Sequence, residues 1–415
     1  MAERMIYTEV KGWGAGTLAL LGVLGALALI GAGGALVMET QGHWITGMTN
    51  RIVWGMPHVF AVFLIVAASG ALNVASVSSV FGRTTYKPLA RLSGVLALSL
   101  LAGGLAVLVL DLGRPDRLIV AMTSYNFKSI FAWNIFLYTG FFAVVIVYLW
   151  MMMERRMNRF TKPAGTFAFL WRLILTTGTG SIFGFLVSRQ AYDAAIMAPL
   201  FIAMSLAFGQ AIFLLVLMVA DRGAGLSLGD GVIRRLKNLL GIFLAATLYF
   251  VAVQHLTNLY IAERQGVERF LLLDGGVYTT LFWAGHVVLG CLVPMALVFH
   301  PATGASRGGV ALASALAVLG GLAQIYVIII GGQAYPLVLV PGMEVSGSVL
   351  DGRVAAYAPS AYEIALGIGG VGMALLMVAL AVKVLPVLPT TLADAAVDPH
   401  CKAKAAAPAT TRAAA

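Results

Sequence analysis

The feature that most constrains this chain is a series of ten apolar segments, each long enough to cross a membrane. A helix needs about 20 mostly apolar residues to cross about 30 Å of hydrocarbon. Such segments lie at 13–37, 55–80, 89–112, 129–153, 166–188, 197–220, 239–262, 277–300, 309–331 and 362–385. The first segment is too long for a signal-peptide core and has no clear cleavage site, so we expect it to be retained. The pattern predicts an all-α polytopic membrane protein of about ten transmembrane helices, with one transmembrane domain over 13–385.

The scarcity of charge excludes a soluble protein. Only 11% of the 415 residues are charged, against about 25% in an ordinary soluble domain. The net charge of +10 is spread over short clusters between apolar runs, and a nucleic-acid partner would need a contiguous basic surface. The basic residues are therefore read as signals for membrane orientation.

The distribution of basic residues predicts the orientation. Ten spans put both termini on one side, and that side carries 19 of the 27 Lys and Arg residues. The positive-inside rule then places both termini in the cytoplasm, and we expect a bacterial inner-membrane protein. Residues 1–12 form a cytoplasmic N-terminus, and the Ala-rich segment 386–415 is expected to be a disordered cytoplasmic tail. The long connection 332–361 would lie in the periplasm, as a docking surface or as a cap on the bundle.

Cysteine usage limits the redox groups that this protein can carry. Cys291 and Cys401 form no CxxC, CxxCH or zinc-ligand spacing. We therefore expect no iron-sulfur cluster, c-type haem or metal site in this protein itself.

Titratable residues inside apolar segments are costly, so each is a candidate for function. The candidates are His58, Asp111, His255, His286 and Glu363. The predicted topology places His58, Asp111 and the start of the fourth span at Ser129 at one depth, near the periplasmic face. An imidazole and a carboxylate in an apolar pocket are suited to accept protons from a quinol headgroup. Two structural alternatives remain: Asp111 begins a helix stop, and His58 is a satisfied histidine near the interface.

His255 and His286 form a second candidate group, because their predicted depths are similar. They could ligate a b-type haem, form a proton relay with Tyr260, Gln324 or Tyr326, or be satisfied by backbone carbonyls. Haem proteins with two axial histidines usually present several such pairs, and this sequence offers one at most, so haem b is not expected. Two other functional classes stay open: a b-type cytochrome that uses these histidines, and a proton-coupled secondary transporter.

Several segments resemble the NrfD/PsrC family of membrane subunits. They are WGMPHVF at 54–60, LDLGRP at 110–115 and KSIFAW at 128–133. Three further segments resemble the DsrP branch of this family, from the DsrMKJOP sulfur-metabolism complexes: GHWITGM at 42–48, GALNVAS at 70–76 and YNFKS at 125–129. The resemblance covers most of residues 5–385.

The resemblance implies two four-helix bundles plus two additional helices, with a quinone-site half over about 13–190 and a second bundle over about 197–385. It implies a subunit that is not catalytic alone and exchanges electrons with menaquinone or ubiquinone near the periplasmic face. The implied partners are a periplasmic ferredoxin-like iron-sulfur subunit (DsrO-like), a c-type cytochrome (DsrJ-like), and haem b membrane and iron-sulfur subunits (DsrM/DsrK-like).

Carried over by position, the resemblance places His58 at the quinone-ligating histidine of the family and Asp111 at its acidic helix end, and we expect these two residues to be catalytic. The second headgroup contact is expected from Asp111, Tyr125 or a water molecule. The resemblance also assigns five residues to the surrounding pocket: Gly55, Arg114, Tyr125, Ser129 and Trp133. Gly55 departs from the pattern, because a polysulfide reductase relative carries a quinone-contacting asparagine there.

Overall fold

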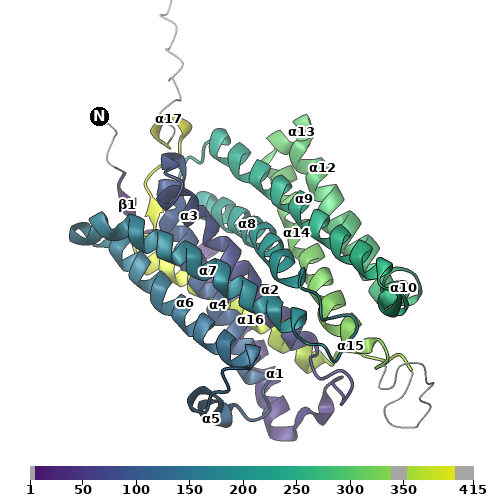
Figure 1. Ribbon diagram of the computed structural model, residues 1–415. Coiled ribbons are helices and arrows are strands. Elements are labelled where there is room, and N and C mark those ends of the chain that lie inside the picture. The colour runs from purple at the N-terminus through teal and green to yellow at the C-terminus, as the bar shows by residue number, and fades with distance from the viewer. Residues whose placement is uncertain (1–4, 338–352, 398–415) are drawn as a thin grey trace, which may run out of the picture.

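The computed structural model describes residues 5–337 and 353–397, and it confirms an all-α polytopic architecture. Ten long helical segments run side by side through the described residues (Figure 1). They are α1 (Ala15–Gln41), α2 (Met56–Ala71) with α3 (Asn73–Ser79), α4 (Ala90–Leu110), α6 (Ile130–Met153), α7 (Thr161–Gly184), α8 (Met197–Ala224), α9 (Asp230–Tyr260), α11 (Val277–Thr280) with η7 (Leu281–Leu292) and α12 (Val293–Phe299), α14 (Arg307–Tyr326) with η8 (Val327–Gly331) and α15 (Gly332–Ala334), and α16 (Ala361–Val384).

Nine of these segments in the described part of the sequence are long and apolar enough to cross a membrane. The tenth, α7, is rich in threonine and glycine and carries Arg172, so its mean hydropathy is lower. Arg172 is nevertheless only 2% exposed. Its guanidinium donates to Asn73 Oδ1 at 2.9 Å and to the Ser69 carbonyl at 3.4 Å, which holds α7 against α2 and α3.

The helices form two four-helix bundles and one additional pair. The first bundle contains α2 with α3, α4, α6 and α7, and the second contains α8, α9, the α11 to α12 segment and α14. α2 is buried along nearly its whole length and joins the bundles by packing against α8. α1 packs mainly on α16, with Gly31 against Gly369, and α16 in turn packs on α2 and α4. Thus α16 lies beside the first bundle, although we expected residues 362–385 in the second half.

Short elements connect the long helices. They are η1 (His43–Ile45), η2 (Thr84–Leu89), η3 (Pro115–Arg117), α5 (Leu118–Thr123), η4 (Arg155–Phe160), η5 (Ala262–Arg264), α10 (Gln265–Arg269), η6 (Phe270–Asp274), α13 (Pro301–Ala305) and α17 (Asp394–Val397). Figure 1 shows β1 and α17 at one end of the helices, called the termini end, and α5, α10 and α15 at the other, called the site end.

The first and last described segments meet at the termini end. Strand β1 (Tyr7–Thr8) pairs antiparallel with β2 (Leu388–Pro389). Val387 and Leu392 are fully buried, and Asp394 accepts hydrogen bonds from the first turn of α9. The expected disordered tail is therefore wrong for residues 387–397, because these residues pack on the bundle through contacts that local composition does not reveal. The rest of that tail, 398–415, lies outside the described residues.

The long connection 332–361 begins at the site end. Its first residues form α15, and Ala355 donates to the Ala334 carbonyl at 2.9 Å, so the two described ends of the connection lie together. Residues 338–352 of this connection lie outside the described residues.

Candidate functional site

His58, Asp111 and His43 meet at the site end of the first bundle. His58 lies in the first turn of α2, Asp111 is the residue that ends α4, and His43 begins η1 after α1. Asp111 Oδ2 lies 2.8 Å from His58 Nδ1, and Asp111 Oδ1 lies 3.7 Å from His43 Nε2. The carboxylate is thus flanked by two imidazoles from different segments. His43 was not among the predicted site residues.

The facing atoms of these three side chains are buried and contact one another without hydrogen bonds of normal geometry. The Asp111 side chain has no exposed surface, while the side chains of His58 and His43 are 17% and 27% exposed. Among the described residues, neither Asp111 oxygen, His58 Nδ1 nor His43 Nε2 has a hydrogen bond of normal geometry. Buried polar atoms usually have a partner, since an unmade hydrogen bond costs about 1–3 kcal/mol. The cluster therefore holds buried polar atoms whose hydrogen-bonding capacity is not used within the described residues.

The electrostatics of the cluster favour a charged carboxylate. Burial raises the pKa of Asp111, but the contacts with His43 and His58 outweigh burial, so that its pKa lies below the ordinary value. The Asp111 carboxylate in turn raises the pKa of His43. An ionised carboxylate beside imidazole can accept a proton from a weakly acidic hydroxyl group.

The end of α4 combines a helix stop with the site. Gly113 has a φ of +69°, the left-handed conformation that ends many helices, and Pro115 follows it. A Cβ atom on Gly113 would come within 3.3 Å of the His43 ring. The structural and functional interpretations of Asp111 are therefore compatible, since the same turn ends the helix and leaves room for His43.

Gly55 lies directly before α2, where backbone and side chains from distant segments converge. A Cβ atom there would be 2.5 Å from Glu363 Oε1 and 2.8 Å from the Tyr357 hydroxyl. Tyr357 donates to Glu363 Oε1 at 2.6 Å and accepts from the Met56 amide at 2.6 Å. Glu363 is fully buried and forms the capping box of α16 with Ser360. The tyrosine and glutamate thus occupy the space beside Gly55 that a larger side chain would need.

Trp54 forms the aromatic side of the cluster. Its ring stacks on His58 with centroids 6.1 Å apart, and it also contacts Phe131, Phe183 and Tyr192. Phe131 belongs to the first turn of α6, which begins directly after Ser129. The start of α6 therefore lies beside Trp54, which stacks on the histidine.

The remaining predicted pocket residues point elsewhere. Arg114 forms an exposed ion pair with Asp116 at 3.0 Å. Tyr125 packs on Phe136 with centroids 4.4 Å apart, and Trp133 is 48% exposed and donates to the Phe127 carbonyl. These contacts form a separate aromatic cluster at the start of α6.

In the second bundle, the predicted relay residues are only partly brought together. His255 Nδ1 lies 2.5 Å from Glu268 Oε2, a partner that the sequence did not suggest. His286 Nδ1 contacts the Gly320 carbonyl at 3.2 Å, and its Nε2 lies 3.9 Å from Cys291 Sγ. Both histidines therefore have protein partners.

The other three predicted relay residues take different positions. Gln324 is buried and, with His255, lines a small cavity. Tyr326 stacks on Tyr278, while Tyr260 is 90% exposed and points away.

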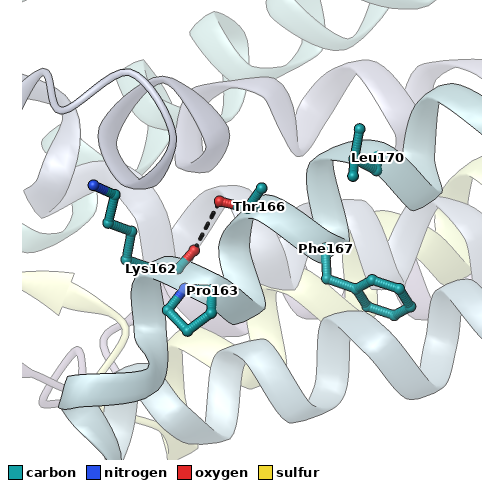
Figure 2. A pocket seen from close by; sticks show the side chains of 5 residues that line it. All are labelled: Lys162, Pro163, Thr166, Phe167 and Leu170. Atoms are coloured by element: carbon teal, nitrogen blue, oxygen red, sulfur yellow. Dashed lines mark hydrogen bonds between the residues drawn. The ribbon is translucent and has the colours of Figure 1, made fainter.

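A shallow hollow on α7 lies apart from both clusters. It is lined by Lys162, Pro163, Thr166, Phe167 and Leu170, and Thr166 donates to the Lys162 carbonyl at 3.0 Å (Figure 2). Phe167 and Leu170 are about half exposed, as expected for a helix that faces lipid. No predicted site residue lines it.

Two residues of these clusters, His43 and Glu268, were not predicted, although their positions relative to the spans could have indicated them. His43 follows the first span, which runs toward the same face as Asp111, so its depth could have placed it beside His58. Glu268 lies in the short helix after the span of His255, and a carboxylate so near an apolar segment is itself a signal.

Comparison with known proteins identifies the family. Residues 44–336 match the family described as polysulphide reductase, NrfD. The sequence is 27% identical to the Hdr-like menaquinol oxidoreductase integral membrane subunit of Archaeoglobus fulgidus, over 94% of this protein and 99% of that one. It is 31% identical to a putative dimethyl sulfoxide reductase membrane subunit of Halobacterium salinarum, over 91% of each.

A third relative is a component of the polysulfide reductase of Wolinella succinogenes, 24% identical over 69% of this protein and 96% of that one. The names of all three relatives refer to parts of oxidoreductases. The family match covers well over half of the sequence and includes His58, Asp111, His255 and His286. The protein belongs to the polysulphide reductase NrfD family.

Proposed function

We propose that this protein is the quinone-reactive membrane subunit of a multisubunit redox complex. The observation that carries the proposal is the buried Asp111 carboxylate between His58 and His43, whose facing atoms make no hydrogen bond of normal geometry among the described residues. A quinol hydroxyl placed there can donate to the carboxylate or an imidazole, and Trp54 supplies an apolar wall for the ring. Menaquinone or ubiquinone would be the exchangeable substrate, and the menaquinol oxidoreductase relative supports the former.

Proton acceptance is the part of the reaction that these residues perform. Oxidation of one quinol releases two electrons and two protons, so each of the two ring oxygens needs an acceptor. Asp111 with His58 takes the proton of one ring oxygen and passes it toward the surface through His43, which is partly exposed, while the proton of the other ring oxygen is released to water at the site end. The electrons leave through a partner subunit, because this protein is proposed to hold no redox centre of its own.

The basic residues favour an orientation with the termini in the cytoplasm and the site end at the periplasmic face of the inner membrane. Large apolar side chains are exposed at this end, including Trp44 in η1, Ile119 and Val120 in α5, and Phe127. We infer that they receive a periplasmic ferredoxin-like iron-sulfur subunit, of the DsrO-like type implied by the resemblance. A DsrJ-like cytochrome and DsrM/DsrK-like subunits would complete such a complex.

Binding of a fluorescent quinol analogue to the full-length protein in nanodiscs tests the site. We expect His58→Ala to weaken binding at least tenfold, while Arg114→Ala, at an exposed ion pair, binds as the wild type does. Unchanged binding in folded His58→Ala would contradict the proposal. An absorption spectrum of the same protein that shows a reducible Soret band would instead favour the b-type cytochrome.

A charged substitution on the exposed apolar surface tests whether the partner subunit docks there. In the intact complex, Ile119→Glu should slow electron transfer from quinol to the iron-sulfur subunit and leave analogue binding unchanged. If electron transfer persists at the wild-type rate, the partner docks elsewhere.

A further inference from the structure

Two buried glutamines in the second bundle have oxygen atoms without a partner. Gln254 is 5% exposed and Gln324 is 2% exposed. In the described structure, the Oε1 atom of each lacks a hydrogen bond. Both side chains, together with His255, line a cavity of about 20 Å³ whose other walls are mainly apolar, among them Leu271 and Ile328.

This cavity has the size and chemistry to hold water. A space of more than about 10–15 Å³ admits one water molecule when it offers two to four polar partners. A water molecule can donate one hydrogen to each glutamine oxygen, which would satisfy both of the unpartnered acceptors. Its own oxygen would remain free to accept a hydrogen bond from a third group that lines the cavity.

His255 and Glu268 form a buried acid-base pair beside this cavity. Glu268 is 1% exposed, and its Oε2 lies 2.5 Å from His255 Nδ1. Its other oxygen accepts from Asn258 Nδ2 at 2.7 Å. Arg264 donates to Asn258 Oδ1 at 3.2 Å and pairs with Asp193, whose side chain is 45% exposed. This series of polar contacts extends from the buried pair to the surface at the site end.

Charged and titratable groups from three other segments surround the pair. Among the described residues, these groups are Arg264 on η5, Asp193 before α8 and His286 on η7. Arg264 and Asp193 compensate each other. With one shared proton the His255 and Glu268 pair is neutral overall, because either the histidine is neutral and the carboxyl protonated, or both are charged. A second proton makes the pair cationic.

We propose that this cavity is a second proton-binding site, occupied by internal water and independent of the quinone site. Water held by Gln254 and Gln324 exchanges protons with the His255 and Glu268 pair. Uptake adds one proton to the imidazole or the carboxylate, release returns it to the water, and no other bond changes. The proposal goes beyond the quinone function, since these residues lie in the other bundle.

Infrared difference spectroscopy tests the site directly. The full-length protein in nanodiscs, without added quinone, is compared at a series of pH values in H₂O and D₂O. We expect a carboxyl band that changes with pH, shifts in D₂O and is lost in Glu268→Gln. Glu154→Gln, at an exposed glutamate of the first bundle, serves as the control and keeps the band.

The water is tested by filling the cavity. Gln324→Leu should displace the water and move the pH midpoint of the band, whereas Gln265→Leu, at an exposed glutamine on α10, should leave the midpoint unchanged. An equal midpoint in both variants would overturn the role of water. This comparison also keeps the proposal testable if Glu268→Gln does not fold.

Two further outcomes separate this proposal from the quinone function. Spectra of Glu268→Gln that match the wild type at every pH would overturn the proton site and leave the quinone site untouched. Loss of the band in folded His58→Ala would overturn the independence of the two sites. We expect Glu268→Gln to bind the quinol analogue with wild-type affinity.

Discussion

Nδ1 of His58 lies 2.8 Å from Oδ2 of Asp111, although the two residues sit at the opening of one helix and the close of another. Neither atom has a hydrogen bond of normal geometry within the described residues. The contact between the two side chains is therefore mainly electrostatic. It makes the cluster sensitive to pH.

The stability of the protein should depend on pH through Asp111 and His43. The lowered pKa of Asp111 contributes stability above the ordinary value near 3.9, and this is lost as the pH falls through the folded value. The raised pKa of His43 contributes stability below about 6.5, and this is lost as the pH rises through the folded value. We expect the melting temperature, followed by tryptophan fluorescence, to be highest between about pH 4 and 6.5 and to vary less in Asp111→Asn. Parallel profiles for the two proteins would refute this.

Gly55→Ala should destabilise the protein and weaken quinol-analogue binding. The added Cβ would meet Glu363 Oε1 at 2.5 Å and the Tyr357 hydroxyl at 2.8 Å, and such overpacking costs about 1–3 kcal/mol. Gly33→Ala is the matched control, because a Cβ atom added at that position in α1 would have no neighbouring atom within 4 Å. It should leave the melting temperature equal or higher, since alanine favours helix by up to about 1 kcal/mol. If both variants melt alike, the space beside Gly55 is not restricted.

Arg172 should stabilise the first bundle through its buried hydrogen bonds. Arg172→Ala removes the donor to Asn73 Oδ1 and leaves a cavity, with an expected loss of about 3 kcal/mol in unfolding free energy. Arg172→Met fills most of the space and removes the buried charge, so its loss should be smaller. Denaturant unfolding in mild detergent measures the difference, and an equal loss in both variants would show that volume plays no part.

Asp394 should stabilise the start of α9 although it belongs to the C-terminal segment. Its carboxylate accepts from the amides of Gly231 at 2.9 Å and Val232 at 3.2 Å, as a capping side chain does. Asp394→Ala should cost about 1 kcal/mol, while Asp394→Asn retains an acceptor oxygen and should cost less. Asp230→Ala removes a carboxylate that is 90% exposed at the same helix end and lies 3.6 Å from Arg307, and it is the control for a charge that does not cap the helix. A larger effect of that control would contradict the capping role.

The spans could be predicted from sequence because the bilayer imposes a length on each apolar segment. The fourth was expected at 129–153 and forms Ile130–Met153, and the tenth was expected at 362–385 and forms Ala361–Val384. α9 begins at Asp230, nine residues before the expected 239, since a helix can continue past the hydrocarbon with polar residues that apolar length does not detect.

The depth of a residue along its span could be predicted from the sequence, but the direction in which its side chain points around the helix could not. A common depth was predicted for His58, Asp111 and the start of α6, and the structure brings His58 and Asp111 into contact while α6 meets them through Trp54. The prediction also grouped Arg114 and Trp133 with them, and those side chains point toward Asp116 and the Phe127 carbonyl instead. Pairings between distant segments, such as His255 with Glu268 or Tyr7 with Pro389, depend on tertiary packing that single-segment patterns do not contain.

The pairing of α1 with α16 also has a consequence for biogenesis. α1 leaves the ribosome before the other spans described above, yet its main neighbour is α16, which leaves after them, and the contact at Gly31 and Gly369 brings the two backbones close together. During synthesis, α1 is therefore inserted without its main helix neighbour and stays exposed to lipid while the two bundles assemble. Only insertion of α16 completes its packing, and pairing of β1 with β2 then ties the segment before the first span to the segment that follows the last.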